Sequence, residues 1–107
     1  MGNATPLADL MVVGPKTKGM FLIDVKGQYR KNPWPIKRKN ERRNFFYALA
    51  FVPPDSPNRF FVLEQSEING YIDDELKRLN RPPDYSMTGV LWKQVEGHEN
   101  AWQVLPQ

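Results

Sequence analysis

Two runs of apolar residues, separated by a short polar break, open the chain. Residues 10–13 and 20–23 are apolar, and the six residues between them begin and end with glycine and include a proline. Glycine and proline at such a break are typical of a turn between two antiparallel strands. The pattern therefore predicts a strand hairpin over residues 9–26.

A second pair of apolar runs predicts a second hairpin. Residues 44–52 are almost wholly apolar, are rich in aromatic side chains, and end at Pro53 and Pro54. This composition is typical of a strand buried on both faces, although periodicity alone leaves a buried helix open. Residues 59–63 are the expected partner strand, across the turn-rich residues 54–58. Pro33 and Pro35, between the two hairpins, argue against regular strand pairing there.

A helical period follows the second hairpin. Ser66 is a suitable N-cap, and Pro82 and Pro83 end the pattern. The apolar residues that recur between them at helical spacing are Ile68, Tyr71, Ile72, Leu76 and Leu79. Together, the elements predict one α+β domain over residues 1–107. It has a mixed sheet of about four strands, built from two hairpins, with one or two helices packed on it.

Composition narrows the class of protein. A chain of 107 residues with 40% hydrophobic and 25% charged residues is long enough to fold around one modest core. It contains no cysteine, which excludes disulfides, zinc–thiolate sites and thiol catalysis. No apolar run reaches the roughly 20 residues that span a bilayer, and the first residues lack the features of a signal peptide. We therefore expect no membrane association and a cytoplasmic location.

Basic residues crowd the stretch between the two hairpins. The net charge is only +3, but seven of the 15 lysine and arginine residues fall within residues 30–43. Such asymmetry produces a positive field that attracts phosphate backbones, although a solvated basic loop is the alternative. Trp34 is the candidate for base stacking within this stretch. The full set of candidate nucleic-acid-binding residues is Arg30, Lys31, Trp34, Lys37, Arg38, Arg42 and Arg43.

The expected register of the first hairpin brings two carboxylates together. If its turn is centred on residues 16 and 17, Asp9 lies opposite Asp24, with Cβ atoms about 5 Å apart. Alternation puts Lys26 on the same face, and Gln28 as well if the strand continues. Two carboxylates this close repel each other unless a cation or a shared proton lies between them. Mg²⁺ or Mn²⁺ suits oxygen ligands of this kind.

A lysine beside the two acids completes a candidate hydrolytic site. The Lys26 ammonium group can hold the attacking water and stabilise developing negative charge. Asp9, Asp24 and the backbone carbonyl of Val25 are the candidate metal ligands, and this set suits phosphodiester hydrolysis. The alternative is that Asp9 simply ends a strand and that Asp24 and Lys26 form a solvent-facing charged pair on a sheet edge.

Residues 9–13, the glycine-bounded turn and residues 21–28 resemble motifs II and III of the PD-(D/E)XK, or restriction-endonuclease-like, nuclease superfamily. In that family an acid begins one element of the site, and an acid-x-lysine unit lies on the next strand. The matching positions are Asp9, Asp24 and Lys26. Gln28 falls where many members carry a glutamine or another polar active-site residue. The resemblance implies a restriction-endonuclease-like core and a metal-dependent nuclease, with DNA as the expected substrate.

Two departures from the family pattern shape the expectation. The family usually has proline immediately before the first acid, whereas this chain has Ala8 there and Pro6 further upstream. The helix that normally precedes the hairpin has no room in the eight residues before Asp9. We therefore expect a truncated or minimal member that lacks this helix, or one in which a partner subunit supplies the missing cover. A homodimer is expected, because apolar surface is left open. The alternatives are a catalytically inactive nucleic-acid-binding module and a protein-interaction domain.

Overall fold

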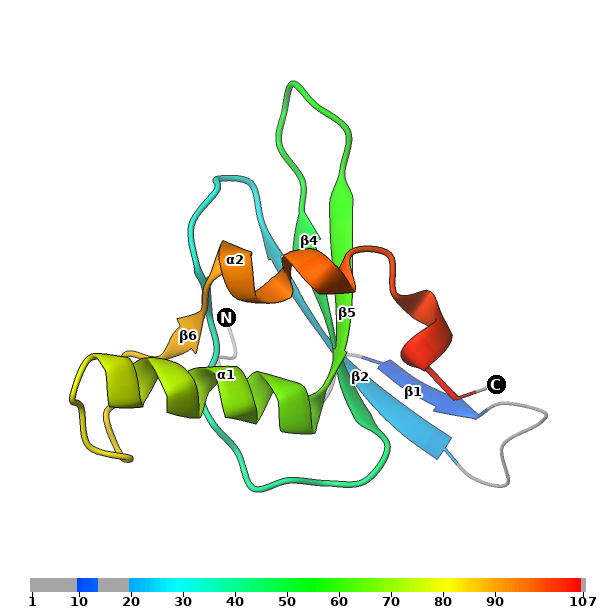
Figure 1. Ribbon diagram of the computed structural model, residues 1–107. Helices are drawn as coiled ribbons and strands as arrows, with labels where there is room; N and C mark the ends of the chain where they lie inside the picture. Colours follow the sequence, from blue (N-terminus) through cyan, green and yellow to red (C-terminus); the bar gives the residue numbers. More distant parts are fainter. Residues whose placement is uncertain (1–9, 14–19, 107) are drawn as a thin grey trace, which may run out of the picture.

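The computed structural model describes residues 10–13 and 20–106, and within them the chain folds as an α+β unit (Figure 1). Asp9 lies outside the described residues. The strands are β1 (Leu10–Val13), β2 (Met20–Gln28), β3 (Trp34–Pro35), β4 (Phe45–Phe51), β5 (Arg59–Glu64) and β6 (Gly89–Val90). The helices are α1 (Gln65–Arg78) and α2 (Trp92–Val95), followed by the short 3₁₀ turns η1 (Glu96–His98) and η2 (Trp102–Val104).

The main sheet has the strand order β1-β2-β4-β5 and is mixed. β1 and β2 are antiparallel and pair Leu10 with Ile23 and Val13 with Met20, which is the register predicted from the sequence. β4 and β5 form the second predicted hairpin. The two hairpins join through β2 and β4, which run parallel. The prediction of an α+β fold with a mixed sheet built from two hairpins is therefore confirmed.

A second, two-stranded sheet lies where regular pairing was not expected. β3 and β6 are antiparallel and pair Trp34 with Val90 and Pro35 with Gly89. The pairing continues for one hydrogen bond, from the Ile36 backbone nitrogen to the Thr88 carbonyl at 3.1 Å. Proline has no amide hydrogen to donate, so the ladder is limited to this short length. The prolines shorten the pairing but do not prevent it.

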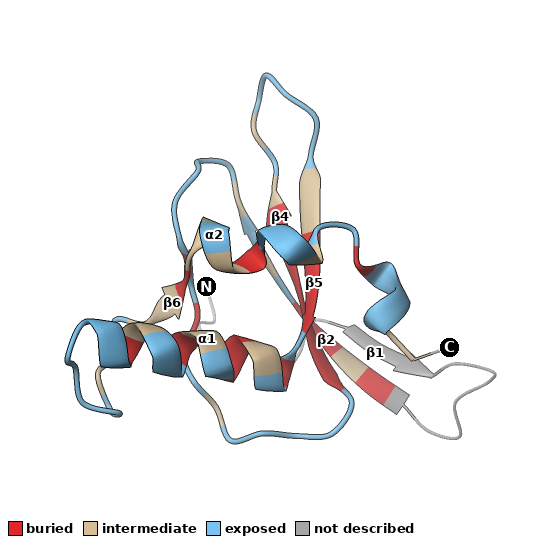
Figure 2. Ribbon diagram, in the orientation of Figure 1, coloured by how far each residue is buried: buried red, intermediate tan, exposed pale blue. Residues whose placement is uncertain are grey.

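The central strand β4 is buried on both faces, as predicted (Figure 2). On one face Phe45, Tyr47 and Leu49 belong to the main core, together with β5 and α1. On the other face Phe46 and Ala48 pack in a smaller cluster on β2. A strand at this position has side chains packed on both sides, which explains its almost continuous apolar sequence.

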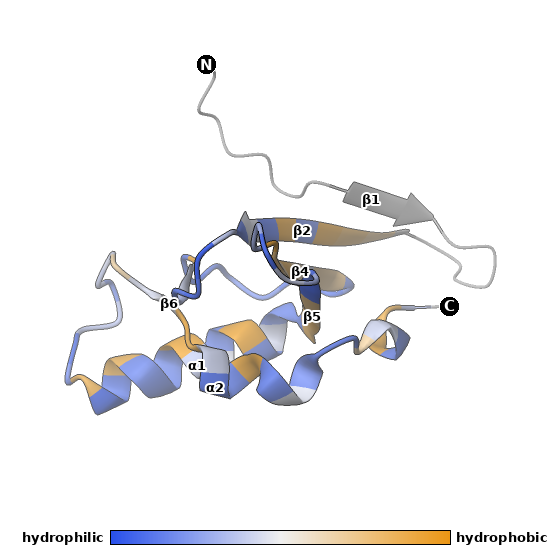
Figure 3. Cartoon of the chain, turned by 90° about the horizontal axis from the view of Figure 1, so that it is seen from above, coloured by the Kyte–Doolittle hydropathy of each residue, from blue (hydrophilic) through white to orange (hydrophobic). Residues whose placement is uncertain are grey.

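Helices α1 and α2 lie on the same face of the sheet (Figure 3). Ile68, Ile72 and Leu76 form the buried stripe of α1, in agreement with the predicted helical period. The N-cap is Glu64 rather than the predicted Ser66, because the Glu67 carboxylate accepts a hydrogen bond from the Glu64 backbone nitrogen at 3.1 Å.

Helix α1 is capped at its C-terminal end before it reaches Pro82 and Pro83. Asn80 has a φ of 56°, and its backbone nitrogen donates to the Lys77 carbonyl at 3.1 Å. The Arg81 nitrogen donates to the Leu76 carbonyl at 2.9 Å, which completes a Schellman motif.

Within the residues that the structure describes, no helix has the length and apolar character needed to cross a membrane.

Candidate active site

The alternation of β2 separates two kinds of side chain. Phe21 and Ile23 pack in the smaller cluster, and Val25 on the same face is 41% exposed. Asp24 and Lys26 therefore point to the opposite face, which is the face that α1 covers. The prediction that these two side chains share a face of the strand is confirmed by their contact.

Asp24 is a buried carboxylate held between two lysines. Its side chain is 4% exposed, and its Oδ1 atom lies 3.6 Å from the Nζ atom of Lys26. Its Oδ2 atom lies 3.7 Å from the Nζ atom of Lys39, whose side chain is 34% exposed. A buried carboxylate without nearby cations is strongly unfavourable, so the two ammonium groups compensate its desolvation. Among the described residues, two ammonium groups face the one carboxylate of Asp24 in this cluster.

Tyr47 is the neighbour of Asp24 on β4. The two residues are directly paired across the parallel strands, so their side chains share the face covered by α1. Burial raises the pKa of Tyr47 to about 12, and the negative charge of Asp24 adds to the increase, whereas a hydrogen bond with Gln65 acts against it. The Tyr47 hydroxyl is therefore protonated at neutral pH and responds to the charge on Asp24.

Lys39 was not among the site residues predicted from the sequence. It lies on residues 29–44, which connect β2 to β4 and are called the crossover segment below. Its proximity to Asp24 depends on how this segment folds back over the sheet, and its position in a basic run gave no reason to distinguish it from its neighbours. The only available signal was the basic run itself.

The basic residues that were predicted to bind nucleic acid do not gather in one patch. Arg30 and Lys31 follow the end of β2, whereas Arg42 and Arg43 precede the start of β4. Because β2 and β4 are parallel and paired from Leu22 to Gln28, these two groups lie roughly 20 Å apart along the strands.

The side chains of three of the basic candidates have partners among the described residues. The guanidinium carbon of Arg30 lies 5.5 Å from the centre of the Tyr29 ring. Arg38 makes a two-pronged ion pair with Asp73 of α1, at 2.8 and 3.1 Å. The ammonium group of Lys31 lies 4.9 Å from the centre of the Trp92 ring. Lys37 lies at a separate, mostly apolar pocket of about 560 Å³ beside the end of α1, together with Glu75 and Met87.

Trp34 is not available as a stacking platform. Its side chain is 1% exposed and packs in the main core, with its ring 4.7 Å from that of Trp92 and 5.5 Å from that of Phe61. The prediction that Trp34 stacks on bases is therefore wrong, because pairing of β3 with β6 turns the ring inward. Among the aromatic residues of the crossover segment, Tyr29 is the exposed one, at 63%.

Gln28 shares the face of Asp24 but does not join its cluster. It lies four residues further along β2, or roughly 13 Å away at the spacing of a strand. Its side-chain nitrogen donates a hydrogen bond to the carbonyl of Asn32 in the following turn. The predicted opposition of Asp9 to Asp24 and the predicted role of the Val25 carbonyl stay predictions.

The described residues offer one carboxylate for a cation at this position. Within residues 10–13 and 20–106, no three acidic or histidine side chains converge on a common point. Mg²⁺ is ordinarily held by one or two carboxylates, with water and substrate phosphate as further ligands. Asp24 is one such carboxylate, and Asp9, the expected second one, lies outside the described residues.

A comparison of the chain with protein-family models, with curated proteins and with solved structures gave no significant match. The functional proposal therefore depends on the geometry of Asp24, its two lysines and the crossover segment.

Proposed function

We propose that this chain is a small metal-dependent nuclease of the PD-(D/E)XK type, with a restriction-endonuclease-like core, that hydrolyses phosphodiester bonds of nucleic acid. DNA is the expected substrate. The observation that carries the proposal is a buried carboxylate, Asp24, in contact with Lys26 on the same strand, at the position that the acid-x-lysine unit of this family would occupy. The Lys39 ammonium group, which the crossover segment places beside Asp24, supports a substrate that carries negative charge.

Each residue has a distinct role in the proposed reaction. Asp24 and Asp9 would hold Mg²⁺ or Mn²⁺, and the Val25 carbonyl would add a ligand. When bound, the cation supplies charge stabilisation and lowers the pKa of water. Lys26 holds the attacking water beside the phosphate and stabilises the negative charge that develops on the phosphate oxygens. The water oxygen forms a bond to phosphorus and gives up a proton to solvent. The bond to the leaving oxygen breaks at the same time, and that oxygen keeps the electron pair and takes up a proton from solvent.

The competing function is a nucleic-acid-binding module of the same fold without catalysis. The observation that favours it is that each carboxylate oxygen of Asp24 already lies within 3.7 Å of a lysine ammonium group. In that case Asp24 serves to hold the two lysines, and the cluster needs no metal. The two functions differ in whether metal-dependent cleavage accompanies binding.

The test is a cleavage screen of the full chain on end-labelled duplex DNA, single-stranded DNA and RNA, with Mg²⁺, with Mn²⁺ and with EDTA. We expect metal-dependent cutting that falls by about 100-fold or more in Asp24→Asn and Lys26→Met. Asp55→Asn, which removes an exposed acid in the turn between β4 and β5, is the matched control and should cut like the wild type. Salt-sensitive binding without any cutting would favour the binding module instead.

A further inference from the structure

The second lysine of the site comes from the crossover segment. The Lys39 ammonium group lies 3.7 Å from Asp24 Oδ2, and it also lies 5.8 Å from the centre of the Phe45 ring. Lys26 approaches the other carboxylate oxygen from β2. Lys26 and Lys39 are therefore supplied by different elements and approach Asp24 through different oxygens.

Three side chains of helix α1, spaced four residues apart, hold the crossover segment in place, two through its backbone and one through the side chain of Arg38. The Gln65 Oε1 atom accepts from the Arg42 backbone nitrogen at 2.7 Å, and the Asn69 Nδ2 atom donates to the Lys39 carbonyl at 2.8 Å. Asp73 binds Arg38. Residues at this spacing lie along one side of a helix, so the three contacts form a continuous row.

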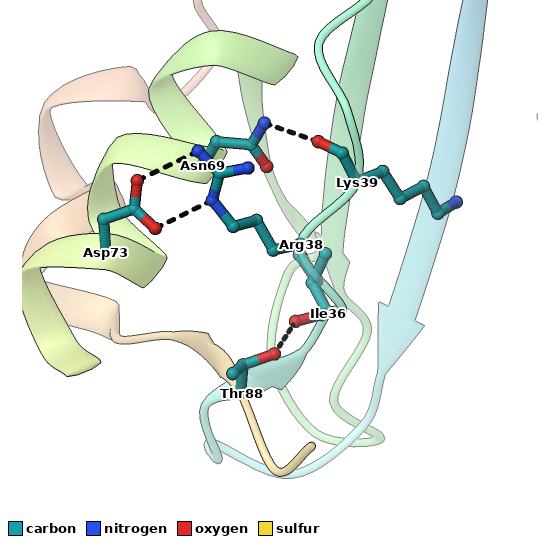
Figure 4. A network of polar contacts seen from close by, with 6 residues as sticks. All are labelled: Ile36, Arg38, Lys39, Asn69, Asp73 and Thr88. Atoms are coloured by element: carbon teal, nitrogen blue, oxygen red, sulfur yellow. Dashed lines mark hydrogen bonds and ion pairs between the residues drawn. The ribbon is translucent and has the colours of Figure 1, made fainter. Parts of the chain in front are cut away.

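These anchors determine which way Lys39 points. Its carbonyl is tied to Asn69, a residue that is 2% exposed, and its side chain extends away from α1 toward β2 (Figure 4). Arg38, the preceding residue, points the other way and meets Asp73 (Figure 4). An extended backbone alternates its side chains, so fixing Arg38 and the Lys39 carbonyl on α1 directs the Lys39 ammonium group to Asp24.

Building on the proposed nuclease function, we propose that Lys39 is a second site lysine that competes with the divalent cation for Asp24 and binds the substrate phosphate. The physical reason is charge. A cation at Asp24 repels the nearby ammonium group, and the Lys39 side chain, which is one-third exposed, has the freedom to leave. A phosphate oxygen then offers it a new negative partner.

The proposal makes two predictions of opposite sign, which a merely structural lysine would not produce. Lys39→Met removes the competing charge, so Mn²⁺ measured by electron paramagnetic resonance should bind at least about threefold more tightly. The same variant loses a phosphate contact, so its affinity for duplex DNA should fall, and the slope of log affinity against log salt should decrease by about 1. Lys39→Arg keeps the charge and should behave like the wild type in the metal titration.

Lys37→Met is the matched control. Lys37 lies on the same segment, two residues earlier, but it lines the pocket beside Glu75 and not the Asp24 cluster, so its loss should leave Mn²⁺ affinity unchanged. If wild type binds Mn²⁺ through Asp24 and Lys39→Met binds it no more tightly, the inference about Lys39 is wrong while the nuclease function stands. If wild type shows no Mn²⁺ binding that depends on Asp24, both proposals are wrong.

Discussion

At the scale of single residues, the central feature is a carboxylate buried beneath two partly exposed lysines. The side chain of Asp24 is 4% exposed, whereas those of Lys26 and Lys39 are 30% and 34% exposed. Burial makes Asp24 dependent on nearby positive charge. A polyanion that approaches this surface meets the ammonium groups before it meets the acid, which suits a site for a phosphate.

Tyr47 provides a spectroscopic reporter of the charge on Asp24. Burial and the Asp24 carboxylate together raise the pKa of Tyr47 to about 12. We expect that Asp24→Asn lowers this pKa, which a tyrosinate absorbance titration of the folded protein measures against Tyr47→Phe. The pKa should stay above its ordinary value, because burial is the larger cause. An unchanged Tyr47 titration would contradict the proximity of the two groups.

The same shift makes stability depend on pH. The Tyr47 pKa is higher in the folded state than in the unfolded chain, so its contribution is fully present below about pH 10 and is lost as pH rises through about 12. Tyr47→Phe removes this contribution, so the variant should lose less stability than wild type between pH 9 and pH 12. Urea denaturation at several pH values measures this difference.

At the scale of elements, α1 organises the site from a distance. Its Gln65, Asn69 and Asp73 side chains hold the segment that carries Lys39. A helix packed on the sheet is a rigid support, so its side chains can fix a connecting segment that has little regular structure of its own.

Asn69 and Asp73, which both hold the crossover segment on α1, should contribute differently to the free energy of unfolding. Asn69→Ala leaves the partly buried Lys39 carbonyl without its side-chain donor, so we expect a loss of about 1–3 kcal/mol in the free energy of unfolding. Asp73→Ala breaks an ion pair with side chains 38% and 48% exposed, which solvent screens, so the loss should stay below about 1 kcal/mol. Urea denaturation compares them, and equal losses would contradict this assignment.

The close approach of β3 to β6 can be tested by substitution of Gly89. A Cβ atom at Gly89 would collide with the backbone carbonyl oxygen of Trp34. Gly89→Ala should therefore destabilise the fold by about 1–3 kcal/mol. Gly70, in α1, has nothing within 4 Å of an added Cβ, and Gly70→Ala should stabilise the protein by up to about 1 kcal/mol because alanine is the better helix former. Thermal melting of both variants measures this contrast.

At the scale of the whole molecule, local patterns were predictable and long-range contacts were not. The register of β1 and β2 followed from a short turn between two apolar runs, and the burial of β4 followed from its composition. The parallel pairing of β2 with β4 joins residues more than 20 positions apart, and no local pattern encodes it. The place of Lys39 depends on this pairing, and the inward turn of Trp34 depends on the equally distant pairing of β3 with β6.

The three polar residues of α1 that hold the crossover segment could have been grouped from the sequence alone. Gln65, Asn69 and Asp73 are spaced four apart within a recognisable helical period, which predicts that they share one side. What they bind could not be predicted, because the crossover segment has no period of its own.

The homodimer stays a prediction, which light scattering over a dilution series can test.

The measurement that tests the central claim most directly is a single-turnover cleavage time course on the preferred nucleic acid, with Mn²⁺, for wild type, Asp24→Asn and Asp55→Asn. The account predicts cutting by wild type and Asp55→Asn at equal rates, and a fall of about 100-fold or more in Asp24→Asn. Folding of each variant is verified by its thermal melting. A folded Asp24→Asn protein that cuts as fast as the wild type would contradict the claim that this buried carboxylate is the centre of a nuclease site.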